Sequence, residues 1–148
     1  MIMFFKIIVS IGLILSLTSC FEISTSTDDT PNIEQSIPLR FKGYWVAFSR
    51  GFESQLGAML IEENSIRFSE GGLRNCKVLE VNDESIFMEL DKPIDEASYI
   101  LLGPISGWDE ELQTVKLKVS FFNKSDGLDS TIINGVEYTH HSKGLYIM

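Results

Sequence analysis

The sequence predicts an all-β domain built as an antiparallel meander of about eight or nine strands. Apolar residues recur at every second position in several short runs, and turn-forming residues separate these runs at intervals of about 8–12 residues. No long segment has helical periodicity. Consecutive hairpins leave long exposed sheet edges, and closing the sheet into a barrel removes them. We therefore expect a small closed barrel, with a β-sandwich as the alternative.

The N-terminal segment has the pattern of a secretory signal peptide. Lys6 precedes an apolar run over 7–17, which is shorter than the about 20 residues that a membrane-spanning helix needs. The run ends in Leu17-Thr18-Ser19-Cys20, which resembles the lipobox of bacterial lipoproteins. The resemblance implies that residues 1–19 are removed and that Cys20 carries a covalent lipid, which anchors the chain in the cell envelope.

Residues 20–38 are predicted to be the lipidated cysteine and a flexible tether, because 24–31 is polar, turn-forming and without apolar periodicity. Phe21, rather than aspartate, follows the cysteine. This resembles the outer-membrane sorting pattern of enteric bacteria and implies a location on the outer membrane, facing the periplasm. The β domain is expected over 39–148.

Strands are expected wherever apolar residues alternate with polar ones or form a short apolar run. These runs are 41–46, 55–62, 65–69, 75–81, 86–91, 99–102, 114–121 and the two sides of Asn134-Gly135, a strong two-residue hairpin pattern. The continuous run 99–102 predicts a strand that is twisted or buried on both faces. In the run 75–81, Cys76 and Val78 are expected to face one way, and Leu79 and Val81 the other.

Turns are expected at Glu63-Asn64, Gly71-Gly72 and Asn82-Asp83. The one expected helical element is a single turn over 108–112, because Ser106 stands three residues before Asp109 in a weak capping pattern.

The first predicted strand contains Gly43-Tyr44-Trp45, which resembles the Gly-x-Trp signature of lipocalins and related barrels. The glycine permits a close backbone approach, and the tryptophan supplies a large apolar area. The resemblance implies a lipocalin-like barrel in which Trp45 plugs one end and lies near a small apolar ligand. The match is confined to these residues, since no arginine follows Arg74 and the Thr-Asp-Tyr turn of lipocalins is missing.

The charge balance restricts the partners. Without residues 1–19 the chain keeps 11 basic and 21 acidic side chains, a formal charge of −10. Such a surface disfavours nucleic acid and anionic lipid headgroups, so the lipid on Cys20 must hold the protein at the membrane. The acidic balance indicates either solubility alone or a basic protein partner.

Catalytic and metal-binding patterns are not recognisable. His140 and His141 are adjacent and would point to opposite faces of a strand. Residues 123–129 contain calcium-loop residue types without the required spacing, and 103–107 lacks the central serine of a nucleophile elbow. We expect no enzymatic activity, no metal and no cofactor besides the lipid. Cys76 is expected to be a buried thiol, with a reactive thiol as the alternative.

The best interaction candidate is the segment 103–113. Here Trp108 stands outside any clear strand, next to Asp109, Glu110 and Glu111. Exposed tryptophan is frequent in binding hot spots, and a Trp108 folded back over the barrel is the alternative. The sequence thus predicts a membrane-anchored, non-catalytic lipoprotein that binds a small apolar ligand or serves the envelope. The alternative is a periplasmic inhibitor or immunity lipoprotein that binds a basic protein.

Overall fold

The computed structural model describes residues 35–124 and 130–148, which belong to a compact unit with the bounds Ile33–Met148. The predicted signal peptide, Cys20, most of the predicted tether and residues 125–129 of the predicted loop 123–129 lie outside the described residues. The elements are η1 (Leu39–Phe41), β1 (Gly43–Ala47), α1 (Arg50–Gln55), β2 (Met59–Ile61), β3 (Ser65–Phe68), β4 (Gly72–Val81), β5 (Ile86–Ile94), β6 (Ala97–Ile105), β7 (Lys116–Lys124), β8 (Ser130–Ile133) and β9 (Val136–Ile147).

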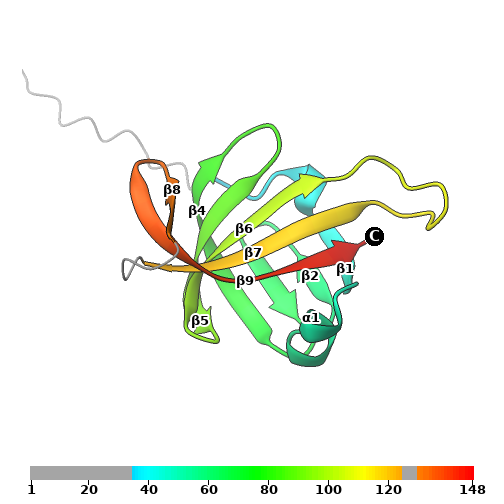
Figure 1. Ribbon diagram of the computed structural model, residues 1–148, viewed down its shortest axis with the longest axis horizontal. Helices are drawn as coiled ribbons and strands as arrows, with labels where there is room; N and C mark the ends of the chain where they lie inside the picture. Colours follow the sequence, from blue (N-terminus) through cyan, green and yellow to red (C-terminus); the bar gives the residue numbers. More distant parts are fainter. Residues whose placement is uncertain (1–34, 125–129) are drawn as a thin grey trace, which may run out of the picture. The chain divides into compact units, whose positions relative to one another are not determined.

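The strands form one antiparallel sheet that closes on itself through hydrogen bonds. From β1 to β7 each strand pairs with the next, and β7 pairs with β9. Strand β9 pairs back with β1, where Val46 lies opposite Ile147 and Ala47 opposite Tyr146. Strand β8 pairs with β9 alone and stands outside this ring (Figure 1). The predicted all-β antiparallel meander is confirmed.

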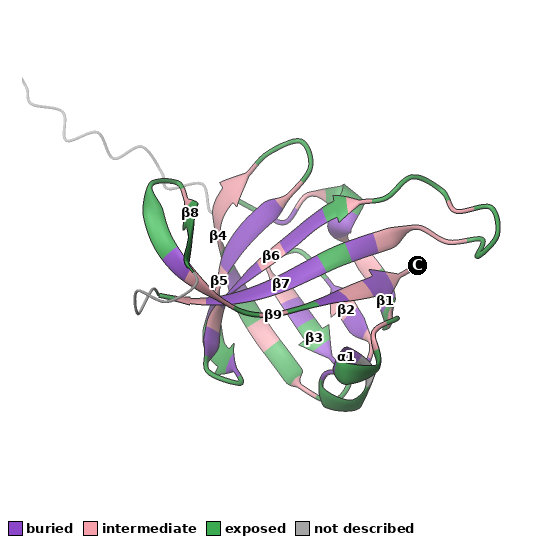
Figure 2. Cartoon of the chain, in the orientation of Figure 1, coloured by how far each residue is buried: buried purple, intermediate pink, exposed green. Residues whose placement is uncertain are grey.

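The main core lies on the inner face of the ring. Its largest fully buried side chains include Trp45, Tyr146, Phe41, Phe68 and Phe121. Helix α1 adds Phe52, whose ring centroid lies 5.6 Å from that of Phe121 and 5.9 Å from that of Tyr146. Figure 2 shows buried residues running along the strands, while the loop between β6 and β7 is largely exposed. The inside of the ring is therefore packed with large side chains.

A second apolar cluster lies on the outer face of the sheet and contains Phe87, Tyr99, Phe122 and Tyr138. The β8–β9 hairpin brings Tyr138 to within 5.0 Å of the Phe87 ring and 4.9 Å of the Tyr99 ring, measured between centroids. Strand β6 is thus buried on both faces, as its continuous apolar run predicts: Ile100 faces the main core and Leu101 the second cluster.

The predicted two-residue hairpin at Asn134-Gly135 is confirmed. Both residues have positive φ angles, 51° and 73°, and Ile133 lies opposite Val136. The turn between β4 and β5 is built around Asn82, whose Oδ1 accepts hydrogen bonds from the amides of Glu84 and Ser85 at 2.9 and 2.8 Å. Short-range turn chemistry therefore fixes the order of the strands.

The predicted strand over 55–62 is wrong in its first half. Arg50–Gln55 forms helix α1, and only Met59–Ile61 is a strand. The reason is the spacing of Phe52 and Leu56: four residues apart on one side of a helical turn, both reach the main core.

A further expectation about local geometry is wrong. Leu79 and Val81 lie on opposite faces, because a register shift between Val78 and Glu80 reverses the alternation. Ile37, which the sequence places in the tether, is fully buried, and its amide donates to the carbonyl of Glu63 at 2.9 Å.

Candidate functional site

The loop that connects β6 to β7 is shaped by its own hydrogen bonds. At its base, the amide of Ser106 donates to the carbonyl of Lys116 at 2.7 Å, and the amide of Lys116 donates to Ser106 Oγ at 2.8 Å. Further out, Asp109 and Thr114 exchange backbone hydrogen bonds of 2.8 and 3.3 Å. The predicted helical turn over 108–112 is therefore wrong: the segment is a turn that this Asp109–Thr114 bridge closes.

The side chain of Asp109 organises the tip of this loop. Its Oδ1 accepts from the amide of Leu112 at 3.0 Å, and its Oδ2 accepts from Lys116 Nζ at 2.8 Å. The hydrogen bond from Lys116, followed by the one from the Leu112 amide, lowers the pKa of Asp109. The carboxylate therefore stays charged, and both of its oxygens accept hydrogen bonds from within the loop and its base.

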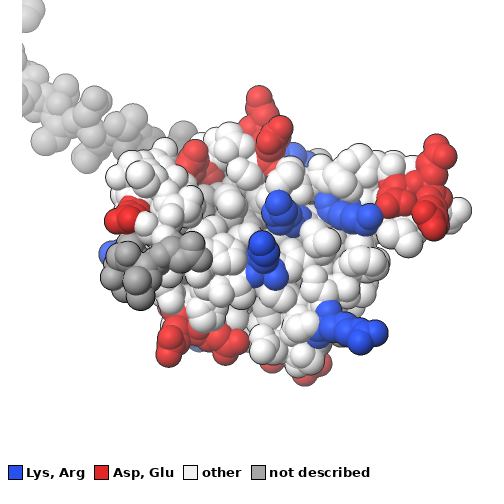
Figure 3. Space-filling model, viewed as in Figure 1, with Lys and Arg blue, Asp and Glu red and all other residues white. Residues whose placement is uncertain are grey.

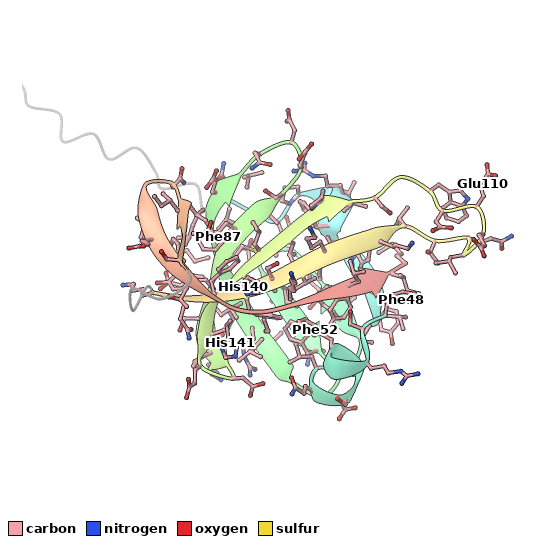
Figure 4. All side chains as sticks on the ribbon, viewed as in Figure 1. Phe48, Phe52, Phe87, Glu110, His140 and His141 are labelled. Carbon is pink, nitrogen blue, oxygen red and sulfur yellow. The ribbon has the colours of Figure 1, made fainter. Side chains whose placement is uncertain are left out.

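Trp108, Glu110 and Glu111 face solvent on the same loop. The Trp108 side chain is 62% exposed, so the structure favours the exposed alternative over the folded-back one. Glu110 lies at the far end of the loop (Figure 4). Within the part of the chain that the structure describes, neither Glu110 nor Glu111 makes an ion pair. The loop therefore presents an indole and two uncompensated carboxylates on a preformed backbone.

Trp45 does not belong to this surface. It is 1% exposed, and its Nε1 donates to the carbonyl of Phe41 at 2.9 Å. Its neighbours are core residues, so the structure does not bring it together with the loop residues Trp108 to Glu111. Cys20, the predicted lipidation site, lies outside the described residues.

The residues that hold the loop in place are not evident from the sequence. The loop is held by contacts among Asp109, Ser106, Thr114 and Lys116. The spacing of Ser106 and Asp109 points to two of these residues, but it predicts a helix cap, whereas the structure has a hydrogen-bonded turn. Val115 and Met148 add a further pair of backbone hydrogen bonds, of 3.1 and 3.2 Å, at the base. The Val115–Met148 pair joins segments that are far apart in the sequence, so no local pattern reveals it.

The two histidines lie apart from the loop, on β9. His140 packs edge-on against Phe122, with ring centroids 5.3 Å apart, and His141 is exposed (Figure 4). Over residues 35–124 and 130–148, no group of three or more His, Cys, Asp or Glu side chains could hold a metal ion. The same residues include no helix that is both long and apolar enough to span a bilayer.

Cys76 is a free, buried thiol on β4. Burial, with a smaller contribution from the charge of Asp91, raises its pKa to about 12, from an ordinary value of 9.0. The unfolded chain therefore loses the thiol proton at lower pH than the folded chain does. The stability that this group contributes is complete below pH 9.0 and is lost as the pH rises toward about 12.

We expect this loss to appear as a difference between the wild-type chain and Cys76→Ala. Above the unfolded pKa, the wild type should lose about 1.4 kcal/mol of unfolding free energy per pH unit relative to the variant. Urea unfolding of both proteins at about pH 8 and pH 10 measures this, and tyrosine titration cancels in the difference. The prediction would be contradicted if the difference in unfolding free energy between the wild type and Cys76→Ala were the same at both pH values.

Comparison with protein-family models, with curated proteins and with solved structures found no match for this chain.

Proposed function

We propose that this chain is a non-catalytic protein-binding module that recognises a basic partner protein through the β6–β7 loop. The observation that carries the proposal is Trp108, exposed beside Glu110 and Glu111 on a loop that internal hydrogen bonds already shape. Burial of an indole supplies affinity, and uncompensated carboxylates steer a basic partner. A preformed loop loses little conformational entropy on binding.

The packing of the core favours this function over the binding of a small apolar ligand inside the ring. Eight-stranded barrels either fill their interior with side chains or hold one small ligand. Here Trp45, Phe68, Phe121 and Tyr146 are nearly or fully buried in one cluster. A ligand inside the ring would compete with these side chains for space.

In this proposal the domain is displayed by a lipid on Cys20, at the periplasmic face of the outer membrane, as an inhibitor or immunity lipoprotein. The support for the anchor is Leu17-Thr18-Ser19-Cys20 directly after an apolar run. We expect a fatty-acid probe to label the wild-type protein in its producing cell and to leave Cys20→Ala unlabelled and released from envelopes. An unlabelled wild-type protein would contradict the anchor without bearing on the loop.

We expect Trp108→Ala to weaken binding of the partner by about 2 kcal/mol, or about 30-fold in Kd, as is typical of a hot-spot tryptophan. Glu110→Gln combined with Glu111→Gln should mainly slow association and reduce its dependence on salt. The full-length wild-type protein is used to capture partners from periplasmic extract at low salt. The Kd and association rate of each purified partner are then measured for the variants.

Ile132→Ala is the matched control, because Ile132 is an exposed apolar residue at 73% but lies on β8 rather than on the loop. It should leave the Kd unchanged. Urea unfolding should show that Trp108→Ala keeps the fold. A partner that binds all variants equally would exclude the loop as the binding surface.

A further inference from the structure

An open pocket of about 410 Å³ lies on the outer face of β7 and β9, and its lining residues are Ser49, Lys118, Ser120, Lys143, Gly144 and Leu145. The register of the two strands creates it. Ser120 lies opposite Lys143 and Lys118 opposite Leu145, so the two lysines are diagonal neighbours on one face. Leu117 and Val119 point the other way, into the main core, which directs Lys118 outward.

The two lysines of this pocket have no carboxylate partner among the described residues. Lys42 and Lys116 pair with Glu63 and Asp109, but neither Lys118 nor Lys143 takes part in an ion pair. No acidic residue lines the pocket. Figure 3 shows basic side chains gathered over β7 and β9, with acidic side chains toward the margins of this face. In a chain of net charge −9, this is a local positive site.

Two hydroxyl groups complete the pocket. Ser120 is 8% exposed and lies directly opposite Lys143. Ser49 Oγ accepts a hydrogen bond of 3.0 Å from the amide of Leu145, which fixes its position and leaves its own proton available for donation. The pocket thus combines two ammonium groups and two hydroxyls, all of which can donate to an anion.

We propose that this pocket binds a phosphate group. A tetrahedral oxyanion has enough oxygens to accept from both lysines and both serines, and lysine binds phosphate as a point charge. Leu145, which is partly buried, offers an apolar wall to the organic part of a phosphate ester. The phosphate is carried either by a soluble compound or by a phospholipid headgroup.

Amide NMR of the ¹⁵N-labelled full-length chain in a nonionic detergent tests the site directly. Inorganic phosphate is expected to shift the amides of Ser120, Lys143 and Leu145 saturably, whereas chloride at the same ionic strength should not. Lys118→Ala and Lys143→Ala should each weaken phosphate binding by about tenfold or more, since each removes a charge-assisted hydrogen bond. Ser120→Ala, which keeps both lysines, should weaken it by a smaller factor.

Lys92→Ala is the matched control, because it removes the same charge from β5, outside the pocket. It should leave the affinity unchanged. A parallel titration with short-chain phosphatidylglycerol distinguishes the sources: shifts of the same amides indicate a lipid headgroup, and a response to inorganic phosphate alone indicates a soluble compound. Shifts that do not saturate with either titrant, or that persist unchanged in both lysine variants, would overturn the proposal.

Discussion

Trp45→Ala is expected to lower the free energy of unfolding by about 3–5 kcal/mol, the usual range for truncating a large aromatic side chain in a core. Trp45 is 1% exposed, and its neighbours in the core include Phe41, Met59 and Tyr146. The substitution removes the indole and leaves a cavity in the core. It also leaves the carbonyl of Phe41 without the hydrogen bond that Nε1 now donates.

Such a loss is a large share of the about 5–15 kcal/mol by which natural domains are stable. Urea unfolding of the full-length chain measures it. Tyr44→Ala is the control, because the adjacent Tyr44 is 61% exposed on the same strand and should change stability by no more than about 0.5 kcal/mol. Equal effects of the two substitutions would show that the indole does not organise the core.

The order of the strands could be predicted from the sequence because it depends on local chemistry. Asn134-Gly135 adopts the positive φ angles that a tight hairpin needs, and the alternation from Val115 to Phe121 predicts a strand with one buried face. The run from Tyr99 to Leu102 predicts burial on both faces. The closure of β9 on β1 follows no local pattern, since it pairs residues about a hundred positions apart in the chain.

Departures from simple alternation could not be predicted in the same way. The register shift at Glu80 places Leu79 and Val81 on opposite faces, and nothing in the residues themselves marks it. Helix α1 forms because Phe52 reaches Phe121 and Tyr146, which are contacts between distant parts of the chain. Tertiary packing decides these features, and it overrides the local preference.

Some residues of the candidate site could likewise be predicted from the sequence, and others depend on tertiary structure. Trp108 could be selected from the sequence because it stands outside every predicted strand among polar residues. The roles of Asp109 and Lys116 in shaping the loop could not, because they depend on how β6 and β7 are joined. Lys118 and Ser120 look like the solvent-facing half of an alternating strand, and only the register with β9 places Lys143 beside them.

Gly103→Ala is expected to destabilise the chain by about 3 kcal/mol or more, because backbone strain and overpacking each cost about 1–3 kcal/mol. Gly103 has a φ of 117°, a region that side chains rarely allow. A Cβ atom there would lie 2.3 Å from the carbonyl oxygen of Glu84 and 2.9 Å from Cα of Ser85. Both are backbone atoms, so neither can turn aside as a flexible side chain would.

Gly107→Ala provides a close control, since a Cβ at this position has no heavy atom within 4 Å and Gly107 is exposed in the loop that follows β6. Its unfolding free energy should match the wild type within about 0.5 kcal/mol. Because Gly103 lies near the end of β6, close to the loop, Gly103→Ala should also displace Ser106 from Lys116 and weaken partner binding. A Gly103→Ala protein as stable as Gly107→Ala would mean that β6 and the β4–β5 turn are not in the close contact described here.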